Sequence, residues 1–309
     1  MLSLFAGLLW LAQAAQAPAS LQPSLPPLYV PERVYDTRKQ AFTDLESMLA
    51  DVAKADVVFV GEQHDDQNTH RLEAAILDGL RRRGVPVTLS LEMFERDTQP
   101  SVNSYLSAGI SEAEFLKASR PWPRYATDYR PLIELAKAHG WPVIAANIPR
   151  RFASSVAKAG LTALDTLTPT ERSWVAAEVK CPKDAYFDRF AATMTDHDGP
   201  GGGTKTNATE EDQRTTTERY YFSQCVKDET MADAIATGFD QFNGKLVVHF
   251  DGAFHSDFGQ GTVDRVRRRL PGRRVAVVTV LPVKDLDTLS PAGEDLKRGD
   301  YLVYTVGRN

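Results

Sequence analysis

Short apolar segments that alternate with amphipathic helices are the feature of this sequence that most restricts its fold. Residues 57–60 (VVFV) and 85–91 (VPVTLSL) are rich in apolar and β-branched residues, and residues 70–82 between them carry apolar side chains at helical spacing. A second predicted helix, 129–138, leads to a third strand at 141–146. Strands that are apolar throughout are buried on both faces, which is typical of a parallel sheet covered by helices.

The alternation is then interrupted before it resumes. Residues from about 151 to 240 are predicted to be helical, and strands follow at 245–250, 274–281 and 301–306. Within the helical region, residues 196–214 are rich in glycine and polar side chains and are predicted to form a mobile loop. The sequence therefore predicts an α/β fold. Its mostly parallel sheet is flanked by helices on both faces, with a helical insertion between the third and fourth core strands.

The first residues of the chain predict export. Residues 2–15 form a short apolar segment, and residues 15–17 (AQA) fit a signal-peptide cleavage site, so we expect residues 1–17 to be a signal peptide. The alternative, an amino-terminal core helix, is disfavoured by the prolines that follow. A proline-rich segment, 18–45, and a single domain, 46–309, complete the predicted organisation. No cysteine lies near the cleavage site, so we expect an exported, periplasmic or extracytoplasmic protein without a lipid-attachment cysteine.

Composition restricts the partners of the chain. The formal net charge is −5 at pH 7, so no basic field is expected to hold a nucleic acid. No apolar run reaches the roughly 18 to 20 residues that a membrane span needs, and we expect a soluble or peripheral mature protein. The two cysteines, Cys181 and Cys225, favour one disulfide in an exported protein, with two free thiols as the alternative.

Polar side chains follow four of the predicted strands. Because the carboxyl ends of parallel strands meet at one edge of a sheet, these side chains are expected to line a common cleft. They are Glu62, His64, Glu92, Asn147, Arg150 and His255. Two imidazoles with one or two carboxylates can bind a divalent metal such as Mn or Zn, or can act as general acid and base. Any single one of them is more often a satisfied polar group at a strand end, but their joint occurrence favours a site.

The remaining histidines have structural interpretations. His70 opens a predicted helix, His249 lies within an apolar strand, and His139 precedes a glycine at a helix end. The segment 119–130 combines two prolines, a tryptophan, two tyrosines and three arginines. It is suited to cover the cleft and stack on a planar ligand, or to pack as a surface loop.

Five of these segments together carry a family resemblance. They are GEQH (61–64), LEMF (91–94), AANIPR (145–150), Y-x-x-Q-x-x-x-D-x-x-M (221–231) and DGAFHSDFGQG (251–261). In this order they resemble the ChaN-like haem-binding uptake proteins of the Tiki/TraB/erythromycin-esterase superfamily. The resemblance extends over residues from about 50 to 285. It implies a site with paired Gly-x-x-His motifs and acidic residues, which serves metal-dependent proteolysis in some branches and metal-independent ester hydrolysis in others. Glu62, His64, Glu92 and His255 match these positions.

The ChaN-like branch implies further properties. Its members are exported bacterial proteins, often lipoproteins, that bind haem at a subunit interface and assist iron acquisition. The resemblance therefore implies haem as cofactor, a homodimer, and outer-membrane haem transport machinery as partner. This chain departs from the branch in lacking the lipid-attachment cysteine, which puts membrane anchoring in doubt.

Candidate haem contacts lie in the inserted region. Ferric haem takes a tyrosine phenolate or an imidazole as axial ligand, and its propionates favour arginine. The candidate ligands are His197, Tyr220 and Tyr221, and the candidate propionate partners are Arg150, Arg189, Arg214 and Arg219. Tyr221 shares one helix face with Gln224, Asp228 and Met231. Packed tyrosines and a solvated His197 are the alternative.

Two functions are consistent with these features. The first is an exported haem-binding protein that assists haem and iron uptake and has an enzyme-like His/Glu cleft of unknown activity. The alternative is a metal-dependent hydrolase, a protease or esterase, in which His64, Glu92 and His255 bind the ion. A metal-free esterase, with His64 or His255 as base and Glu92 as its partner, is a variant of the second.

Overall fold

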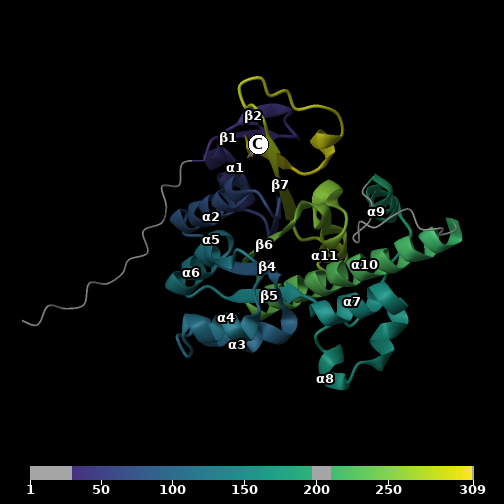
Figure 1. Ribbon diagram of the computed structural model, residues 1–309. Helices are drawn as coiled ribbons and strands as arrows, with labels where there is room; N and C mark the ends of the chain where they lie inside the picture. Colours follow the sequence, from purple (N-terminus) through teal and green to yellow (C-terminus); the bar gives the residue numbers. More distant parts are fainter. Residues whose placement is uncertain (1–29, 197–209, 308–309) are drawn as a thin grey trace, which may run out of the picture.

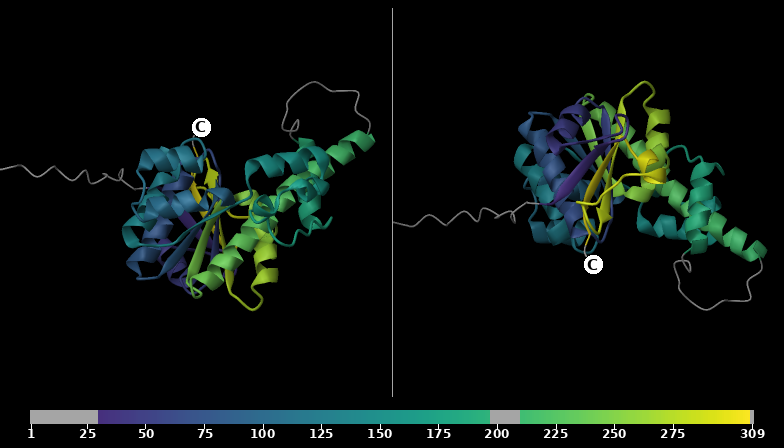
Figure 2. Two further views of the ribbon diagram at one scale, coloured as in Figure 1. Left: turned by 90° about the horizontal axis from the view of Figure 1, so that it is seen from below. Right: turned by 90° about the horizontal axis from the view of Figure 1, so that it is seen from above.

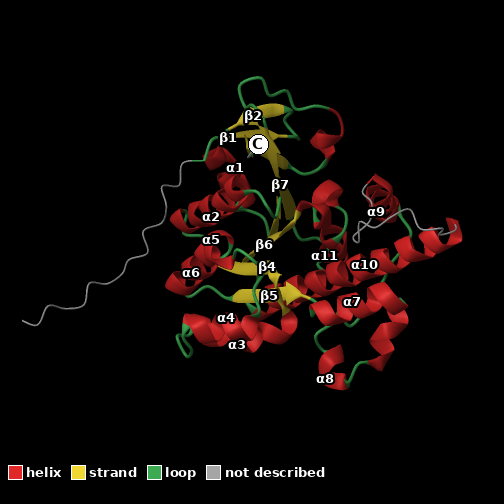
Figure 3. Cartoon of the chain, in the orientation of Figure 1, coloured by secondary structure: helices red, strands yellow, loops and turns green. Residues whose placement is uncertain are grey.

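The computed structural model describes residues 30–196 and 210–307, in which an eight-stranded sheet is packed between helices (Figure 1, Figure 3). The strands are β1 (Glu32–Asp36), β2 (Ala41–Thr43), β3 (Val57–Glu62), β4 (Val87–Glu95), β5 (Val143–Asn147), β6 (Leu246–Gly252), β7 (Val275–Val283) and β8 (Tyr301–Val306). Their order in the sheet is β2-β1-β8-β7-β3-β6-β4-β5. All pairs among β3 to β8 are parallel, and β1 is antiparallel to β2 and β8. The predicted α/β fold is confirmed.

Helices cover both faces of the sheet (Figure 2). One face is covered by α1 (Leu45–Val52), α2 (Gln67–Arg82), α3 (Gln99–Leu106), α4 (Glu112–Ser119), α5 (Tyr125–Asp128) and α6 (Arg130–His139), and the other by α10 (Glu210–Gln241) and α11 (Thr262–Arg269). The pleat of β3 shows why both faces are needed. Val58 and Val60 pack in the core on the α2 side, whereas Val57 and Phe59 pack on the other side with Ile235 of α10.

The sheet begins before the predicted domain boundary at residue 46. Strand β1 pairs along its whole length with β8, and β2 extends the edge beyond it. Only Val34 and Asp36 are buried in β1, so this half-covered strand lacks the continuous apolar run that identified the others. The predicted signal peptide and residues 18–29 of the predicted proline-rich segment lie outside the described residues.

The predicted helical insertion separates β5 from β6. It contains α7 (Arg150–Ala159), α8 (Pro169–Arg172), α9 (Ala185–Asp196) and the long helix α10. The carboxyl-terminal half of α10 packs on the sheet through Ile235 and Phe239, whereas its first half extends away from the sheet beside α7 and α9 (Figure 2). Residues 210–214 of the predicted loop are helical, and residues 197–209, including His197, lie outside the described residues.

A disulfide joins Cys181 to Cys225. It ties the segment before α9 to α10, so the favoured alternative from the sequence is confirmed. Short 3-10 helices complete the structure: η1 (Arg96–Thr98), η2 (Leu161–Thr166), η3 (Ala253–His255), η4 (Asp257–Gly259) and η5 (Gly293–Lys297). Among the helices of residues 30–196 and 210–307, none combines the length and apolarity that a membrane span requires.

Candidate functional site

The polar strand ends meet because β3, β6, β4 and β5 are neighbours in the sheet. Glu62, the last residue of β3, lies beside Gly252, the last residue of β6. Glu62, Glu92, Asn147 and His255 are buried, whereas the side chain of His64 is 45% exposed. Arg150 lies on the surface at the start of α7. The structure therefore brings the predicted Glu/His residues to one edge of the sheet.

The first half of the site is an imidazole–carboxylate pair. His64 Nδ1 donates to Glu62 Oε1, which also accepts a hydrogen bond of 3.0 Å from the Tyr129 hydroxyl. Burial alone would raise the pKa of Glu62, but hydrogen bonds from His64 and His70 hold it well below its ordinary value. Burial opposes protonation of His64, and the Glu62 hydrogen bond outweighs it and raises the His64 pKa. Both shifts therefore favour the ion-pair form of the two side chains.

A second pair faces the first. His255 Nδ1 lies 2.6 Å from Asp228 Oδ1. Asp228 accepts further hydrogen bonds from the hydroxyls of Tyr186, at 2.8 Å, and Thr262, at 2.9 Å. Burial would lower the pKa of His255, but the charges of Glu92 and Asp228 raise it to about 10. Asp228 thus fixes the orientation of this imidazole, and Glu92 and Asp228 together favour its protonated form.

Glu92 lies between the two imidazoles. Its Oε2 accepts a hydrogen bond of 2.8 Å from the Gly252 backbone N–H, and its Oε1 lies 3.4 Å from His255 Nε2. Burial opposes ionisation, yet the charges of His255 and His64 lower the Glu92 pKa to about 2. Gly252 is needed for this close approach, because a Cβ at this position would lie 2.6 Å from His64 Nε2.

The predicted cover segment 119–130 contacts the site. The Trp122 ring lies edge-to-face on the His64 ring, with 5.0 Å between centroids. Arg124 donates to the backbone carbonyl of His64 and forms an ion pair of 2.9 Å with Asp128. The arginines that flank the Pro-Trp-Pro sequence, Arg120 and Arg124, have left-handed backbone conformations, with φ of 48° and 65°. The segment therefore packs against the exposed histidine of the pair.

His70 lies directly behind Glu62, although it was interpreted as a purely structural residue. Its Nδ1 is 3.0 Å from Glu73 Oε2 and 3.4 Å from Glu62 Oε2. Burial lowers the His70 pKa, but hydrogen bonds with the two glutamates raise it to about 11. In the described part of the chain, the group of potential metal ligands whose donor atoms all lie within 4.8 Å is Glu62, His70 and Glu73. Of these three residues, only Glu62 was predicted to be a site residue.

The candidate haem residues lie along the inserted helices rather than at the strand ends. Tyr221 is buried, and its hydroxyl donates to the Pro182 carbonyl at 2.5 Å. Burial raises the Tyr221 pKa to about 12, which opposes phenolate formation. Tyr220 is half-buried on α10. Of the candidate arginines, Arg150 and Arg214 are exposed, Arg219 donates to the Lys158 carbonyl at 3.2 Å, and Arg189 donates to the Phe254 carbonyl at 2.8 Å.

Three further participants were not identified as site residues: two come from helices, and Tyr129 lies in the turn between α5 and α6. Tyr129 contacts Glu62, Tyr186 contacts Asp228, and Glu73 contacts His70. Only the spacing of His70 and Glu73, three residues apart on α2, was a usable signal in the sequence. The other two histidines fit their interpretations: His249 bonds Ser90 within the sheet at 2.9 Å, and His139 is exposed.

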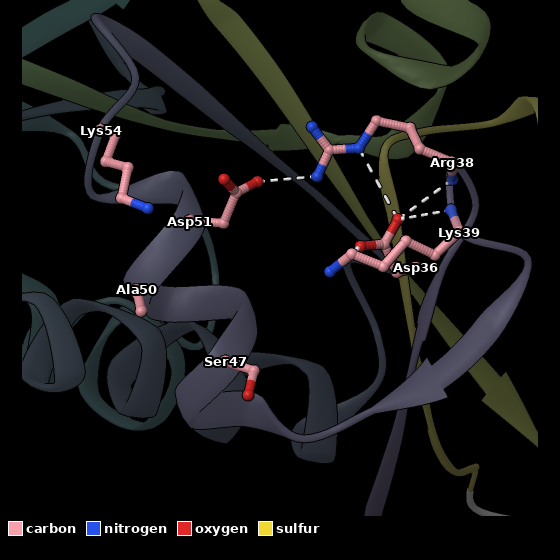
Figure 4. A pocket seen from close by; sticks show the side chains of 7 residues that line it. All are labelled: Asp36, Arg38, Lys39, Ser47, Ala50, Asp51 and Lys54. Carbon is pink, nitrogen blue, oxygen red and sulfur yellow. Dashed lines mark hydrogen bonds and ion pairs between the residues drawn. The ribbon is translucent and has the colours of Figure 1, made fainter.

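A separate pocket lies between β1 and α1 (Figure 4). Its lining residues are Asp36, Arg38, Lys39, Ser47, Ala50, Asp51 and Lys54. Asp51 forms ion pairs of 2.7 Å with Arg38 and 2.8 Å with Arg274, the residue before β7. The pocket therefore lies toward the amino ends of the parallel strands and is distinct from the site at their carboxyl ends.

Comparison with solved structures identifies similar folds. The ChaN protein of Campylobacter jejuni, in a structure described as showing cofacial haem binding, is 17% identical. The alignment covers 89% of this chain and 97% of that protein, with a TM-score of 0.64. A Bacillus cereus protein matches with 11% identity over 85% of this chain and 92% of its own, at a TM-score of 0.47. An erythromycin esterase in an open conformation is 13% identical, and the alignment covers 90% of this chain and 83% of that protein, with a TM-score of 0.44.

Among curated proteins, none matches this sequence significantly. A family model described as haem-binding uptake, Tiki superfamily, ChaN, matches residues 48–266. The matched region is more than half of the chain and contains Glu62, His64, Glu92, Asp228 and His255. The chain therefore belongs to the ChaN family of haem-binding uptake proteins in the Tiki superfamily.

Proposed function

We propose that this protein is an exported haem-binding protein that assists haem and iron uptake. The observation that carries the proposal is the family match over residues 48–266, which includes the sheet edge and most of the inserted helices. The proposal includes release into the periplasm or another extracytoplasmic space after cleavage of residues 1–17, a homodimer, and delivery of haem to or from outer-membrane transport machinery.

The inserted helices supply donors of the kind that ferric haem requires. Tyr220 on α10 is half-buried, so its phenol is partly accessible, whereas the Tyr221 hydroxyl is taken by the Pro182 carbonyl. The exposed guanidinium groups of Arg150 and Arg214 are suited to propionates. We therefore assign axial ligation to Tyr220, with His197 as the other candidate. Bound haem would supply a ferric centre with an axial coordination position.

A haem titration followed by the Soret band tests this assignment. The untagged protein should saturate near one haem per chain and shift the band from its position in free haem. Tyr220→Phe should weaken binding about tenfold or more, whereas Tyr221→Phe is the matched control and should bind as the wild type does. His197→Ala tests the other candidate. A spectrum that stays that of free haem would exclude the proposal, and a shift unaffected by any of the three variants would exclude the assigned ligands.

The two imidazole–carboxylate pairs around Glu92 favour a hydrolase as the second candidate. Glu92, with a pKa of about 2, is ionised at neutral pH and can accept a hydrogen bond from the attacking water and orient it. His255, with a pKa of about 10, holds a proton that it can donate to a leaving group. His64 is the exposed member and faces incoming substrate. In the metal-dependent form, His64, Glu92 and His255 would hold a divalent ion that lowers the pKa of its bound water.

An esterase and peptidase assay distinguishes the two functions. Glu92→Gln and His255→Asn should each reduce hydrolysis about 100-fold or more and leave haem binding unchanged. Tyr220→Phe should weaken haem binding and leave hydrolysis unchanged. Repeating the assay after treatment with a chelator separates the metal-dependent from the metal-free form. Hydrolysis that survives in the Glu92→Gln, His255→Asn double variant would reject the hydrolase.

A further inference from the structure

A buried cluster of Glu62, His70 and Glu73 lies beneath the His64–Glu62 pair. Glu62 ends β3, whereas His70 and Glu73 lie one turn apart in the first half of α2. All three are buried, with exposed fractions of 2%, 3% and 0%. Their donor atoms lie within 4.8 Å of one another. The cluster is therefore compact enough for a single small ion to contact all three side chains.

The hydrogen bonds of His70 leave its Nδ1 directed at the two glutamates. The opposite ring nitrogen, Nε2, lies 3.1 Å from the backbone carbonyl of His64 and 3.4 Å from Asp128 Oδ2, and both oxygens act as acceptors. Nε2 must therefore carry a proton, and the lone pair of the neutral ring is on Nδ1. Nδ1 faces Glu62 Oε2 at 3.4 Å and Glu73 Oε2 at 3.0 Å. A histidine that donates its far N–H to a carbonyl and directs the near nitrogen at carboxylates has the arrangement of a metal ligand.

The carboxylate oxygens of the cluster are incompletely satisfied. Glu62 Oε2 and Glu73 Oε1 are buried and have no hydrogen-bond partner. Buried carboxylates require a cation or a proton, because the loss of hydration is otherwise uncompensated. Protonated His64 and His70 can balance these two carboxylates, but only while both imidazoles keep their second proton. One divalent cation would neutralise both carboxylates directly.

We propose that Glu62, His70 and Glu73 bind a divalent transition metal ion of the Zn²⁺ or Mn²⁺ type. One imidazole and two carboxylates form a donor set that both ions accept. The ion would hold Glu62 through Oε2 and leave Oε1 to His64 and Tyr129. The ion would position His64 indirectly, through Glu62. Its three ligands are buried on the side of Glu62 that faces away from the exposed His64 ring. The site differs from the predicted ion between His64, Glu92 and His255, and it does not depend on haem binding.

Cobalt substitution tests the site in the untagged full chain. After removal of metal with a chelator, Co²⁺ should bind at one equivalent and produce visible d–d absorption, and Zn²⁺ should displace it. Glu73→Gln keeps the size of the side chain and removes its charge, so we expect at least tenfold weaker binding in this variant and in His70→Asn. His139→Asn, at an exposed histidine outside both sites, is the matched control and should bind as the wild type does, whereas His255→Asn tests the other candidate ion site.

X-ray absorption of the zinc-loaded wild type provides a test that does not depend on variants folding. One imidazole with oxygen ligands supports the cluster, whereas two imidazoles would place the ion between His64 and His255 and overturn the proposal. Failure of the wild type to bind Co²⁺ or Zn²⁺ would also overturn it, and the cluster would then be neutralised by protons. The proposal would also be overturned if folded Glu73→Gln and His70→Asn still bound the ion while His255→Asn did not.

Discussion

Asp228 Oδ1 lies 2.6 Å from His255 Nδ1, and this contact joins the middle of α10 to η3, the short helix that follows β6. Both side chains are buried. The relationship repeats, on the other side of Glu92, the contact between Glu62 and His64. Each imidazole of the site therefore has its own carboxylate. The carboxylate of His64 comes from β3, and that of His255 comes from α10.

Replacement of Asp228 tests what this carboxylate contributes. In Asp228→Asn, His255 loses its nearest anion, so its pKa should fall from about 10 by roughly one unit or more. The folded state should also lose about 3 kcal/mol or more, because an imidazolium is left without its buried partner. NMR titration of the His255 ring and urea unfolding measure the two effects. Tyr186→Phe removes only one hydrogen bond to Asp228 and should change the pKa less. An unchanged pKa in Asp228→Asn would contradict this account.

Gly252 is expected to be intolerant of a methyl group for steric reasons alone. Its φ of −58° is open to any residue, but a Cβ would lie 2.6 Å from His64 Nε2. Gly252→Ala should displace the His64 ring, weaken its bond to Glu62, and cost about 1 to 3 kcal/mol of stability. A shift of the His64 ring resonances reports the displacement. Gly140→Ala is the control: φ there is 61° and nothing lies within 4 Å, so stability should fall by about 1 kcal/mol while His64 keeps its resonances.

The candidate site residues at strand ends were predictable because a parallel sheet fixes their neighbours. Glu62 and Glu92 lie in the last residues of buried strands and His255 lies just beyond one, and parallel strands place their carboxyl ends along one edge. The order that puts β6 between β3 and β4 was not predictable. No local pattern encodes which strand pairs with which, since that depends on packing across the whole sheet.

The helical partners could not be predicted for a related reason. Asp228 was placed on a helix face, but its contact with His255 depends on how α10 lies across the sheet. Tyr186 reaches the same carboxylate from α9, which the disulfide holds beside α10. His70 looked like an ordinary helix-start residue, because its contact with Glu62 arises only when the chain turns back over β3.

His249 should make the fold sensitive to acid. Burial lowers its pKa to about 3 in the folded protein, against about 6.5 when unfolded. Below pH 6.5 this histidine therefore binds a proton in the unfolded state but stays neutral in the folded state. The contribution of neutral His249 to the free energy of unfolding is complete above pH 6.5 and is lost as the pH falls toward 3, by about 1.4 kcal/mol per pH unit. Urea unfolding at pH 7 and pH 5 measures how far the free energy of unfolding falls between the two pH values. This fall should be about 2 kcal/mol smaller in His249→Asn than in the wild type. Equal losses would show that this histidine is not the acid-sensitive group.

Gln99 shields the open edge of the sheet. Strand β5 is the last in the sheet order, and the Gln99 amide donates to the Val143 carbonyl at 2.7 Å and accepts from the Ala145 N–H at 2.8 Å. The side chain thus occupies the hydrogen-bonding groups that a further strand would use.

Removing this side chain tests whether it protects the edge. Gln99→Ala leaves both backbone groups without their partner and should cost about 1 to 3 kcal/mol. It should also increase self-association, because the free edge can pair with another chain. Gln99→Glu retains the acceptor for the Ala145 N–H but loses the donor for the Val143 carbonyl. The stability of this variant should therefore lie between those of the wild type and Gln99→Ala. Thermal unfolding and light scattering at several concentrations measure these effects. A Gln99→Ala protein as stable and as monodisperse as the wild type would show that water satisfies this edge equally well.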